Sequence, residues 1–282
     1  MNKDAETASR TLGNRARAFL DRLPLERQGG RQLRRLAEGG VVGDWFGCEL
    51  ASVFQPIVQP SDGSTVAYAA YLRIFGSGER ALSPWTLFAA NAHDDRLVAL
   101  DRVARTVHAL NFLDSVEGDG LLFLMVHGRL LAAVSGDHGT AFRKVVDALD
   151  LAPDRVVIET PLEASRQPDL LALVVRNYRN NGFQVAVNVE SPEQWAALSA
   201  RVPAQFVKIE HTRLPSGEDW RARLGGLAAV DARTRVVVTR LEHKLGGGLP
   251  AGVLAQGYAY GLPARRAAIM RAQRHVLDRF AY

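Results

Sequence analysis

Apolar residues recur in two different rhythms along most of the chain. From about residue 48 onward, short apolar runs rich in β-branched residues alternate with longer stretches in which apolar residues return every three to four positions. The first pattern is typical of buried strands and the second of amphipathic helices. The strand-like runs are 53–58, 66–74, 121–126, 155–158, 183–187, 206–209 and 235–238, and the helix-like stretches are 101–113, 139–149, 170–180, 192–200 and 219–230. This alternation predicts an α/β sheet or barrel, whose reactive side chains lie at the C-terminal ends of the strands.

The first 46 residues follow another pattern. One apolar stripe of a helix is formed by Leu12, Ala16, Phe19, Leu20 and Leu23. Pro24 interrupts it, and a short second helix is predicted around residues 31–38, ended by Gly39 and Gly40. We therefore divide the chain into a basic helical extension, residues 1–46, and a barrel domain, residues 47–282. A stripe this narrow needs a partner, which is the barrel, a second copy of the chain or another protein.

Composition limits the class of protein. The chain has 282 residues, of which 47% are hydrophobic and 23% charged, as in a soluble protein with a large core. No apolar run approaches the ~20 residues that span a bilayer, and the first residues lack the apolar core of a signal peptide. We therefore expect a cytoplasmic protein without membrane contact. The single cysteine, Cys48, cannot form an intrachain disulfide, and no cluster of cysteine and histidine indicates zinc.

The net charge of +5 is unevenly distributed. Residues 1–40 contain nine lysines and arginines and five acidic residues, which leaves the rest of the chain nearly neutral. A basic arm can attract nucleic acid, anionic lipid or an acidic protein. An excess this modest favours a solvated helical face instead, so we expect no nucleic-acid binding.

Two sequence blocks resemble the ends of a known domain. The block from Phe54 to Val58 (FQPIV) and the block from Gln256 to Pro263 (QGYAYGLP) resemble the opening and closing motifs of the EAL domain, a bacterial enzyme domain that hydrolyses cyclic di-GMP. The resemblance covers residues 52 to about 280 and implies a modified (β/α)8, TIM-like barrel. It also implies two divalent metal ions, Mg²⁺ or Mn²⁺, which would need several converging carboxylates.

This sequence departs from the EAL pattern at most metal-binding positions. The metal ligands of the family fall on Ala69, Met125, Asn188, Val189 and Thr239. Two of these side chains have no donor atom, and a thioether is a poor ligand for a hard cation. The matching residues that remain are Glu159, Glu210 and Lys208. The resemblance thus implies a domain with no catalytic residue, no metal and no cofactor, which does not turn over cyclic di-GMP.

The positions that resemble ligand-binding residues of the family are better preserved. They are Gln55, Tyr71, Arg73, Glu242, Gln256 and Pro263. The guanidinium of Arg73 can form a forked contact to a phosphate, and the carboxylate of Glu242 can accept from the adjacent N–H donors of guanine. Tyr71 could stack on a base or fill the pocket. Each residue also has a structural alternative: a salt bridge at the barrel end for Arg73, a surface charge for Glu242 and a strand cap for Gln55.

A mobile, glycine-rich loop of the family is replaced here by the segment 190–195. Ser191 and Pro192 suit the cap and first turn of a helix, which predicts a stiffened segment. Trp195 is an interface anchor if exposed and a core residue otherwise.

Three functions follow from these residues. The first is a catalytically inactive EAL-like domain that binds cyclic di-GMP and signals through a protein partner in a bacterial pathway. The second is a regulatory domain that acts through protein contacts alone, without nucleotide, and homodimerisation stays open in both. An active phosphodiesterase is the least favoured of the three.

Overall fold

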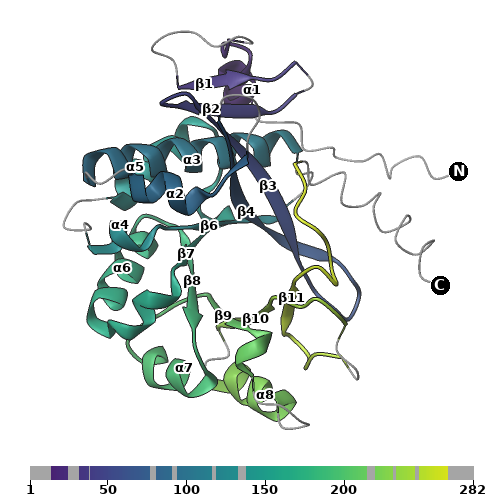
Figure 1. Ribbon diagram of the computed structural model, residues 1–282. Coiled ribbons are helices and arrows are strands. Elements are labelled where there is room, and N and C mark those ends of the chain that lie inside the picture. Colours follow the sequence, from purple (N-terminus) through teal and green to yellow (C-terminus); the bar gives the residue numbers. More distant parts are fainter. Residues whose placement is uncertain are drawn as a thin grey trace, which may run out of the picture.

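Eight strands form a closed barrel. The computed structural model describes residues 14–24, 32–37, 39–76, 81–90, 94–115, 119–132, 138–214, 220–230, 233–244 and 248–265. The barrel strands are β3 (Cys48–Val58), β4 (Thr65–Phe75), β6 (Leu121–Met125), β7 (Val156–Thr160), β8 (Gln184–Val189), β9 (Phe206–Glu210), β10 (Arg235–Thr239) and β11 (Leu254–Gln256). Strand β3 pairs with both β4 and β11 and so closes the ring, which is seen nearly end-on in Figure 1.

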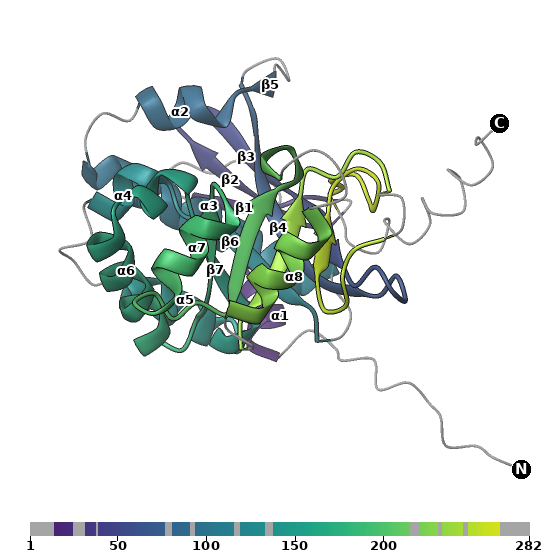
Figure 2. The ribbon, with the colours of Figure 1, turned by 90° about the horizontal axis from the view of Figure 1, so that it is seen from below.

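The barrel is modified by the direction of one strand. Strands β4 and β6 to β11 run parallel to their neighbours, whereas β3 is antiparallel to both β4 and β11. The surrounding helices are α2 (Pro84–Ala90), α3 (Asp94–Ser115), α4 (Gly128–Ala132), α5 (His138–Ala148), α6 (Pro168–Asn180), α7 (Pro192–Ser199) and α8 (Trp220–Val230). Most of them cover the outside of the barrel, whereas α2 lies near β5 (Ala81–Leu82) at one end of it (Figure 2). The predicted TIM-like barrel is therefore confirmed, and each predicted run and stretch beyond residue 47 overlaps a strand or helix of its type.

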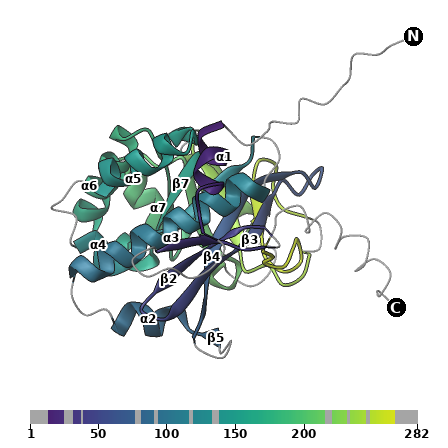
Figure 3. The same cartoon turned by 90° about the horizontal axis from the view of Figure 1, so that it is seen from above.

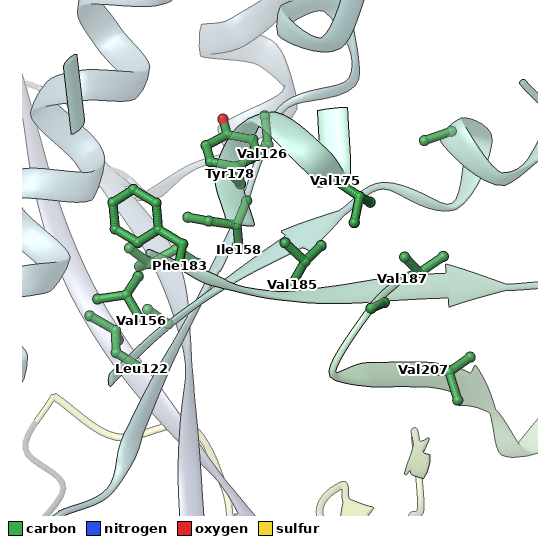
Figure 4. Close-up of a cluster of buried hydrophobic side chains, with 14 of the residues drawn as sticks. Leu122, Val126, Val156, Ile158, Val175, Tyr178, Phe183, Val185, Val187 and Val207 are labelled. Atoms are coloured by element: carbon green, nitrogen blue, oxygen red, sulfur yellow. The ribbon is translucent and has the colours of Figure 1, made fainter. Parts of the chain in front are cut away.

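Two apolar layers hold the barrel together because successive side chains of a strand point to opposite faces. Between strands and helices lies a large cluster that includes Ile158, Val185 and Val187 from the strands and Val175 and Tyr178 from α6 (Figure 4). A smaller cluster fills the barrel interior and contains Ile57, Ala67, Ala69, Phe123, Val157, Ala186, Phe206, Val237 and Leu254. Polar side chains can face inward only beyond this interior layer, toward the strand ends.

The N-terminal segment differs from the prediction. Helix α1 (Asn14–Leu20) lies within the predicted first helix and buries Ala16 and Leu20, while Leu12 lies outside the described residues. Leu20 belongs to the large cluster and Leu23 packs against it, so this part of the apolar stripe packs on the barrel body, while Phe19 is exposed. Figure 3 shows α1 beside α3.

The predicted second helix around residues 31–38 is wrong. Residues Leu33–Arg35 form strand β1, which pairs antiparallel with β2 (Val41–Trp45), and β2 pairs with β3. Gly39 and Gly40 adopt φ values of 91° and 90° and turn the chain between the two strands, an arrangement that glycine permits at low cost. Hydrogen bonding between strands therefore overrides the local helix propensity of this stretch.

A side chain of α3 adds to the pairing that holds β2 on β3. The amide of Asn111 on α3 accepts from Val41 N at 2.7 Å and donates to Val41 O at 2.7 Å. Val41, Val42 and Trp45 are buried, so this end of the extension packs as part of the barrel body. Within the part of the chain that the structure describes, no helix combines the length and apolar character needed to cross a membrane.

Candidate functional site

A cavity of about 630 Å³ opens at the C-terminal ends of the parallel strands. Side chains from all eight barrel strands, from the loops that follow them and from α2 line it. The lining includes all six predicted ligand-binding residues, which are Gln55, Tyr71, Arg73, Glu242, Gln256 and Pro263. It also includes six of the residues at former metal-binding or catalytic positions, which are Met125, Glu159, Asn188, Lys208, Glu210 and Thr239. The strand order thus brings together residues that lie more than 200 positions apart.

Two of the singled-out positions do not line the cavity. Ala69 is buried one layer deeper in the barrel, opposite Phe123 of the neighbouring strand. Val189 is buried on the outer face of β8, in the cluster between strands and helices. The alternation of strand side chains explains the second placement, because Asn188 before it points inward. Neither side chain reaches the cavity.

A buried ion pair forms one wall of the cavity. Lys208 Nζ lies 2.6 Å from Glu159 Oε2, and both side chains are more than nine-tenths buried. Asn188 Nδ2 donates to Glu159 Oε1 at 2.9 Å and to Thr160 O at 2.7 Å. The lysine ammonium also lies 5.4 Å from the centre of the Phe123 ring. Both oxygens of Glu159 therefore have donors within the protein, as a buried carboxylate requires.

A second polar group forms the cavity floor. Gln256 Nε2 donates to the Tyr71 hydroxyl at 2.7 Å and to Gln55 Oε1 at 3.1 Å. Gln55 Nε2 in turn donates to Gly261 O at 3.1 Å. Burial raises the pKa of the Tyr71 hydroxyl above its ordinary value, with a further contribution from the nearby negative charge of Glu159. Tyr71 therefore stays a neutral phenol that is held in place at the floor.

Charged residues at the rim divide into paired and unpaired groups. The carboxylate of Glu210 is bound from two sides, by Arg240 Nε at 3.0 Å and by Arg213 Nε at 3.4 Å. Arg73 is exposed, and its one hydrogen bond to another described residue goes to the backbone carbonyl of Leu72, at 3.1 Å. Glu242 is exposed on the loop after β10. Arg73 and Glu242 are thus accessible at different strand ends, and the exposed carboxylate of Glu163 lines the same cavity.

The loop that carries Arg240 and Glu242 packs closely against Gly257. A Cβ atom on Gly257 would lie 2.2 Å from Leu241 O and 2.3 Å from Leu241 N, distances that the backbone cannot accept. Leu241 N donates to Gln256 O at 3.2 Å, and Ala259 N donates to Leu241 O at 2.9 Å. The closing sequence block therefore holds the loop after β10 by close backbone contact.

The segment after β8 is also tied down. Ser191 Oγ caps α7 by accepting from Gln194 N at 3.2 Å, and Gln194 Oε1 accepts from Glu190 N at 2.7 Å. Gln194 thus binds both the cap residue and the residue before it, and Pro192 occupies the first turn of the helix. The predicted cap is confirmed. Trp195 is fully buried and belongs to the core.

Comparison with known proteins agrees with this geometry. The family model described as EAL domain matches residues 46–226, which is more than half of the chain. The chain belongs to the EAL family. No curated protein matches it.

Solved EAL structures share the fold at low sequence identity. A PaMucR phosphodiesterase in complex with c-di-GMP has a TM-score of 0.60 and 16% identity, over 78% of this chain and 98% of that one. The FimX EAL domain from Pseudomonas aeruginosa bound to c-di-GMP has a TM-score of 0.60 and 18% identity, over 77% and 91%. The Bacillus subtilis YkuI protein, with c-di-GMP as substrate and calcium, has a TM-score of 0.62 and 18% identity, over 82% and 60%. The chain thus spans nearly all of the two shorter structures and about three fifths of YkuI.

The donor set of this EAL domain does not fit a pair of divalent metal ions. Among the described residues, no three histidine, cysteine, aspartate or glutamate side chains come together as metal ligands would. Glu159 already binds an ammonium and an amide, and Glu210 already binds two guanidinium groups. Met125 offers only sulfur at its strand end, which a hard cation binds poorly.

Several residues that line the cavity carry no functional assignment from the sequence. They include Trp85, Pro161, Leu162, Glu163, Arg213, Arg240, Gly257 and Tyr258. Trp85 comes from α2, so the expectation that site residues follow the barrel strands does not include it. Arg213 follows Glu210 by three residues in a short 3₁₀ helix, His211–Arg213, and that spacing was a usable signal.

Proposed function

We propose that this EAL domain binds cyclic di-GMP without hydrolysing it and passes the signal to a protein partner in a bacterial pathway. One observation carries the proposal. The carboxylates that remain at metal-binding positions are neutralised by side-chain cations, whereas Arg73 and Glu242 are exposed at the same cavity. The groups suited to a phosphate and to a guanine edge are therefore available, and the groups suited to metals are occupied.

Ground-state binding and catalysis need different residues. Binding needs contacts to phosphate and base, while metal ligands act mainly on the transition state of hydrolysis. Gln55, Gln256 and Pro263 complete the binding surface, and Tyr71 presents its ring at the floor. A cavity of about 630 Å³ lies within the ~300–1,000 Å³ that ligand sites occupy. Cyclic di-GMP is also the bound molecule in the three solved EAL structures named above.

Titration calorimetry with cyclic di-GMP tests this function. Binding should be measurable in EDTA and should change little when Mg²⁺ or Mn²⁺ is added. Arg73→Ala should weaken binding by roughly ten- to hundredfold, because it removes a charge-assisted contact of ~1.5–3 kcal/mol. Arg176→Ala is the matched control, since Arg176 is an exposed arginine on α6 that does not line the cavity. GTP should compete poorly because it has only one guanine.

The contradicting result is equally clear. If the wild-type protein shows no binding at high micromolar cyclic di-GMP, the cavity is vestigial. If Arg73→Ala binds cyclic di-GMP as tightly as the wild type, Arg73 takes no part in binding, although the domain still binds the nucleotide.

A second candidate is a regulatory domain that acts by protein contact without nucleotide, and one observation favours it. Phe46 is 77% exposed at the turn between β2 and β3, with a φ of 44° that is costly for a bulky residue. The guanidinium of Arg96 lies 5.6 Å from the centre of its ring. Phe46→Asn suits the turn and removes the aromatic surface. Loss of self-association in sedimentation would identify a homodimer contact there, and unchanged sedimentation would exclude it.

A further inference from the structure

We infer that Arg240 is a phosphate-binding arm of this cavity, held on Glu210 in the free protein and transferred to a phosphodiester when the ligand binds. This inference rests on the proposed function, because it names a residue that would hold the nucleotide. Arg240 is not among the six residues that the sequence singles out for ligand binding, although it lines the same cavity.

The backbone of Arg240 is the first observation. Its φ is 57°, in the left-handed region that glycine favours and that a long side chain adopts at a cost in free energy. Residues in such conformations cluster at ligand clamps and switch regions, where the surrounding structure fixes them. Here the fixing contact is the close approach of Leu241, the residue after Arg240, to Gly257 of the closing sequence block.

The ion pair of Arg240 is the second observation. Its guanidinium contacts Glu210 through Nε at 3.0 Å, although its side chain is 71% exposed. An exposed ion pair is weak, so it can exchange for another anion at little cost. Glu210 would not be left unpaired, because Arg213 holds its other oxygen at 3.4 Å. The carboxylate therefore acts as a resting counter-ion that can release one of its two arginines.

The position of Arg240 relative to Arg73 is the third observation. Both arginines line the same cavity, one after β10 and one on β4. Both also act electrostatically on the Tyr71 hydroxyl, where each opposes the rise of its pKa. Their guanidinium groups thus lie within Coulombic range of one point at the cavity floor. A phosphodiester above Tyr71 would carry a single negative charge and could accept from both forks.

Substitution of Arg240 by glycine provides an unusually clean test. Arg240→Gly relieves the left-handed backbone, so its melting temperature should equal or exceed that of the wild type. Cyclic di-GMP, added in EDTA, should nevertheless bind about tenfold more weakly, because one charge-assisted contact is lost. Equal or tighter binding by Arg240→Gly would overturn the inference and make Arg240 a plug of the cavity.

Substitution of Glu210, the counter-ion, distinguishes the release of Arg240 from a general change in the charge of the cavity. Glu210→Gln frees Arg240 and should strengthen cyclic di-GMP binding by a few fold, roughly the free energy of an exposed ion pair. The gain should be larger with Arg240 present than in the Arg240→Gly background, where only the change in cavity charge remains. Equal gains in both backgrounds would contradict the release of Arg240 from Glu210.

These outcomes are distinguishable from failure of the proposed function. If the wild type, Arg240→Gly and Glu210→Gln all fail to bind cyclic di-GMP, the proposed function fails and the inference falls with it. If the wild type binds and Arg240→Gly binds equally, the function stands and only the role of Arg240 is refuted.

Discussion

The ammonium of Lys208 lies 2.6 Å from the carboxylate of Glu159 inside the mouth of the barrel, and both side chains are buried. A buried charge is stable only when it is paired and hydrogen-bonded, and Asn188 completes the pairing by donating to the same carboxylate. In this domain the pair therefore has a structural role in addition to its place in the cavity wall. Removal of the pair should therefore lower the stability of the fold, whether or not a ligand is present.

Lys208→Met should lower the free energy of unfolding by about 3 kcal/mol, because it leaves the carboxylate of Glu159 buried without its cation. Adding Glu159→Gln should recover part of the loss, since the buried charge is then gone. Urea unfolding of the single and double variants checks both statements. Arg201→Met is the control, because the pair of Arg201 with Asp169 is exposed and should contribute less than about 1 kcal/mol. Equal losses for Lys208→Met and Arg201→Met would contradict the structural role.

Cyclic di-GMP should not be converted to the linear dinucleotide, even in excess Mg²⁺ or Mn²⁺. The expectation follows from the occupied carboxylates of Glu159 and Glu210 and from the thioether of Met125 at the cavity. Chromatography of long incubations measures the product, with an active EAL phosphodiesterase assayed in parallel. Product that accumulates in proportion to protein concentration, and that survives repurification, would show that the site is catalytic.

Gly257→Ala should disturb the loop that carries Arg240 and Glu242. The added methyl group would overlap the backbone of Leu241, which cannot move without breaking its hydrogen bonds to Gln256 and Ala259. We expect a loss of stability of about 1–3 kcal/mol together with weakened cyclic di-GMP binding. Gly225→Ala is the matched control, because a Cβ at that position on α8 meets nothing within 4 Å. A Gly257→Ala variant as stable as Gly225→Ala would mean that the loop adapts.

The barrel could be predicted from the sequence because the barrel strands are buried on both faces, whereas the helices are buried on one face. Those two burial patterns leave different periodicities, and runs such as 183–187 and 206–209 were located within a few residues of β8 and β9. Strand β11 was missed because three residues are too few to show a period. Strand β1 was misread as helix because its pairing with β2, which lies beyond a turn, outweighs the local preference of its residues.

The sequence predicted part of the residues that line the cavity, but not the contacts between them. Residues at strand ends could be placed around one cavity because the strand order of a barrel is regular. The ion-pair partner of each charged residue could not be predicted from the sequence. The pairing of Arg240 with Glu210, for example, depends on the left-handed backbone conformation of Arg240. Trp85 was missed because it enters the cavity wall from α2, between two strands.

Stability should depend on pH through His108. This imidazole is buried on α3 beside the Ser52 hydroxyl, at 2.7 Å, and burial lowers its pKa to about 3, below the ordinary value of 6.5. Because the pKa is lower in the folded state, the unfolded chain binds the extra proton. The contribution of neutral His108 is therefore complete above pH 6.5 and is lost as the pH falls from 6.5 toward 3.

His108→Gln keeps a hydrogen-bonding side chain and removes the titration. Between pH 6.5 and pH 5 the wild type should lose about 2 kcal/mol more unfolding free energy than His108→Gln, at 1.36 kcal/mol for each pH unit. Urea unfolding across this range measures the difference. Parallel curves for the two proteins would show that His108 does not titrate with folding.

Trp85 should report the nucleotide directly. Its side chain on α2 is 73% exposed and lines the same cavity as Met125 and Leu162, whereas Trp195 is fully buried in the core. An aromatic ring at the rim offers a stacking surface for a base, a contact of ~1–3 kcal/mol, so Trp85→Ala should weaken cyclic di-GMP binding by roughly tenfold. Trp85→Phe should retain most of the affinity but lose the change in tryptophan fluorescence on binding. A full fluorescence change in Trp85→Phe, or wild-type affinity in Trp85→Ala, would place the base elsewhere in the cavity.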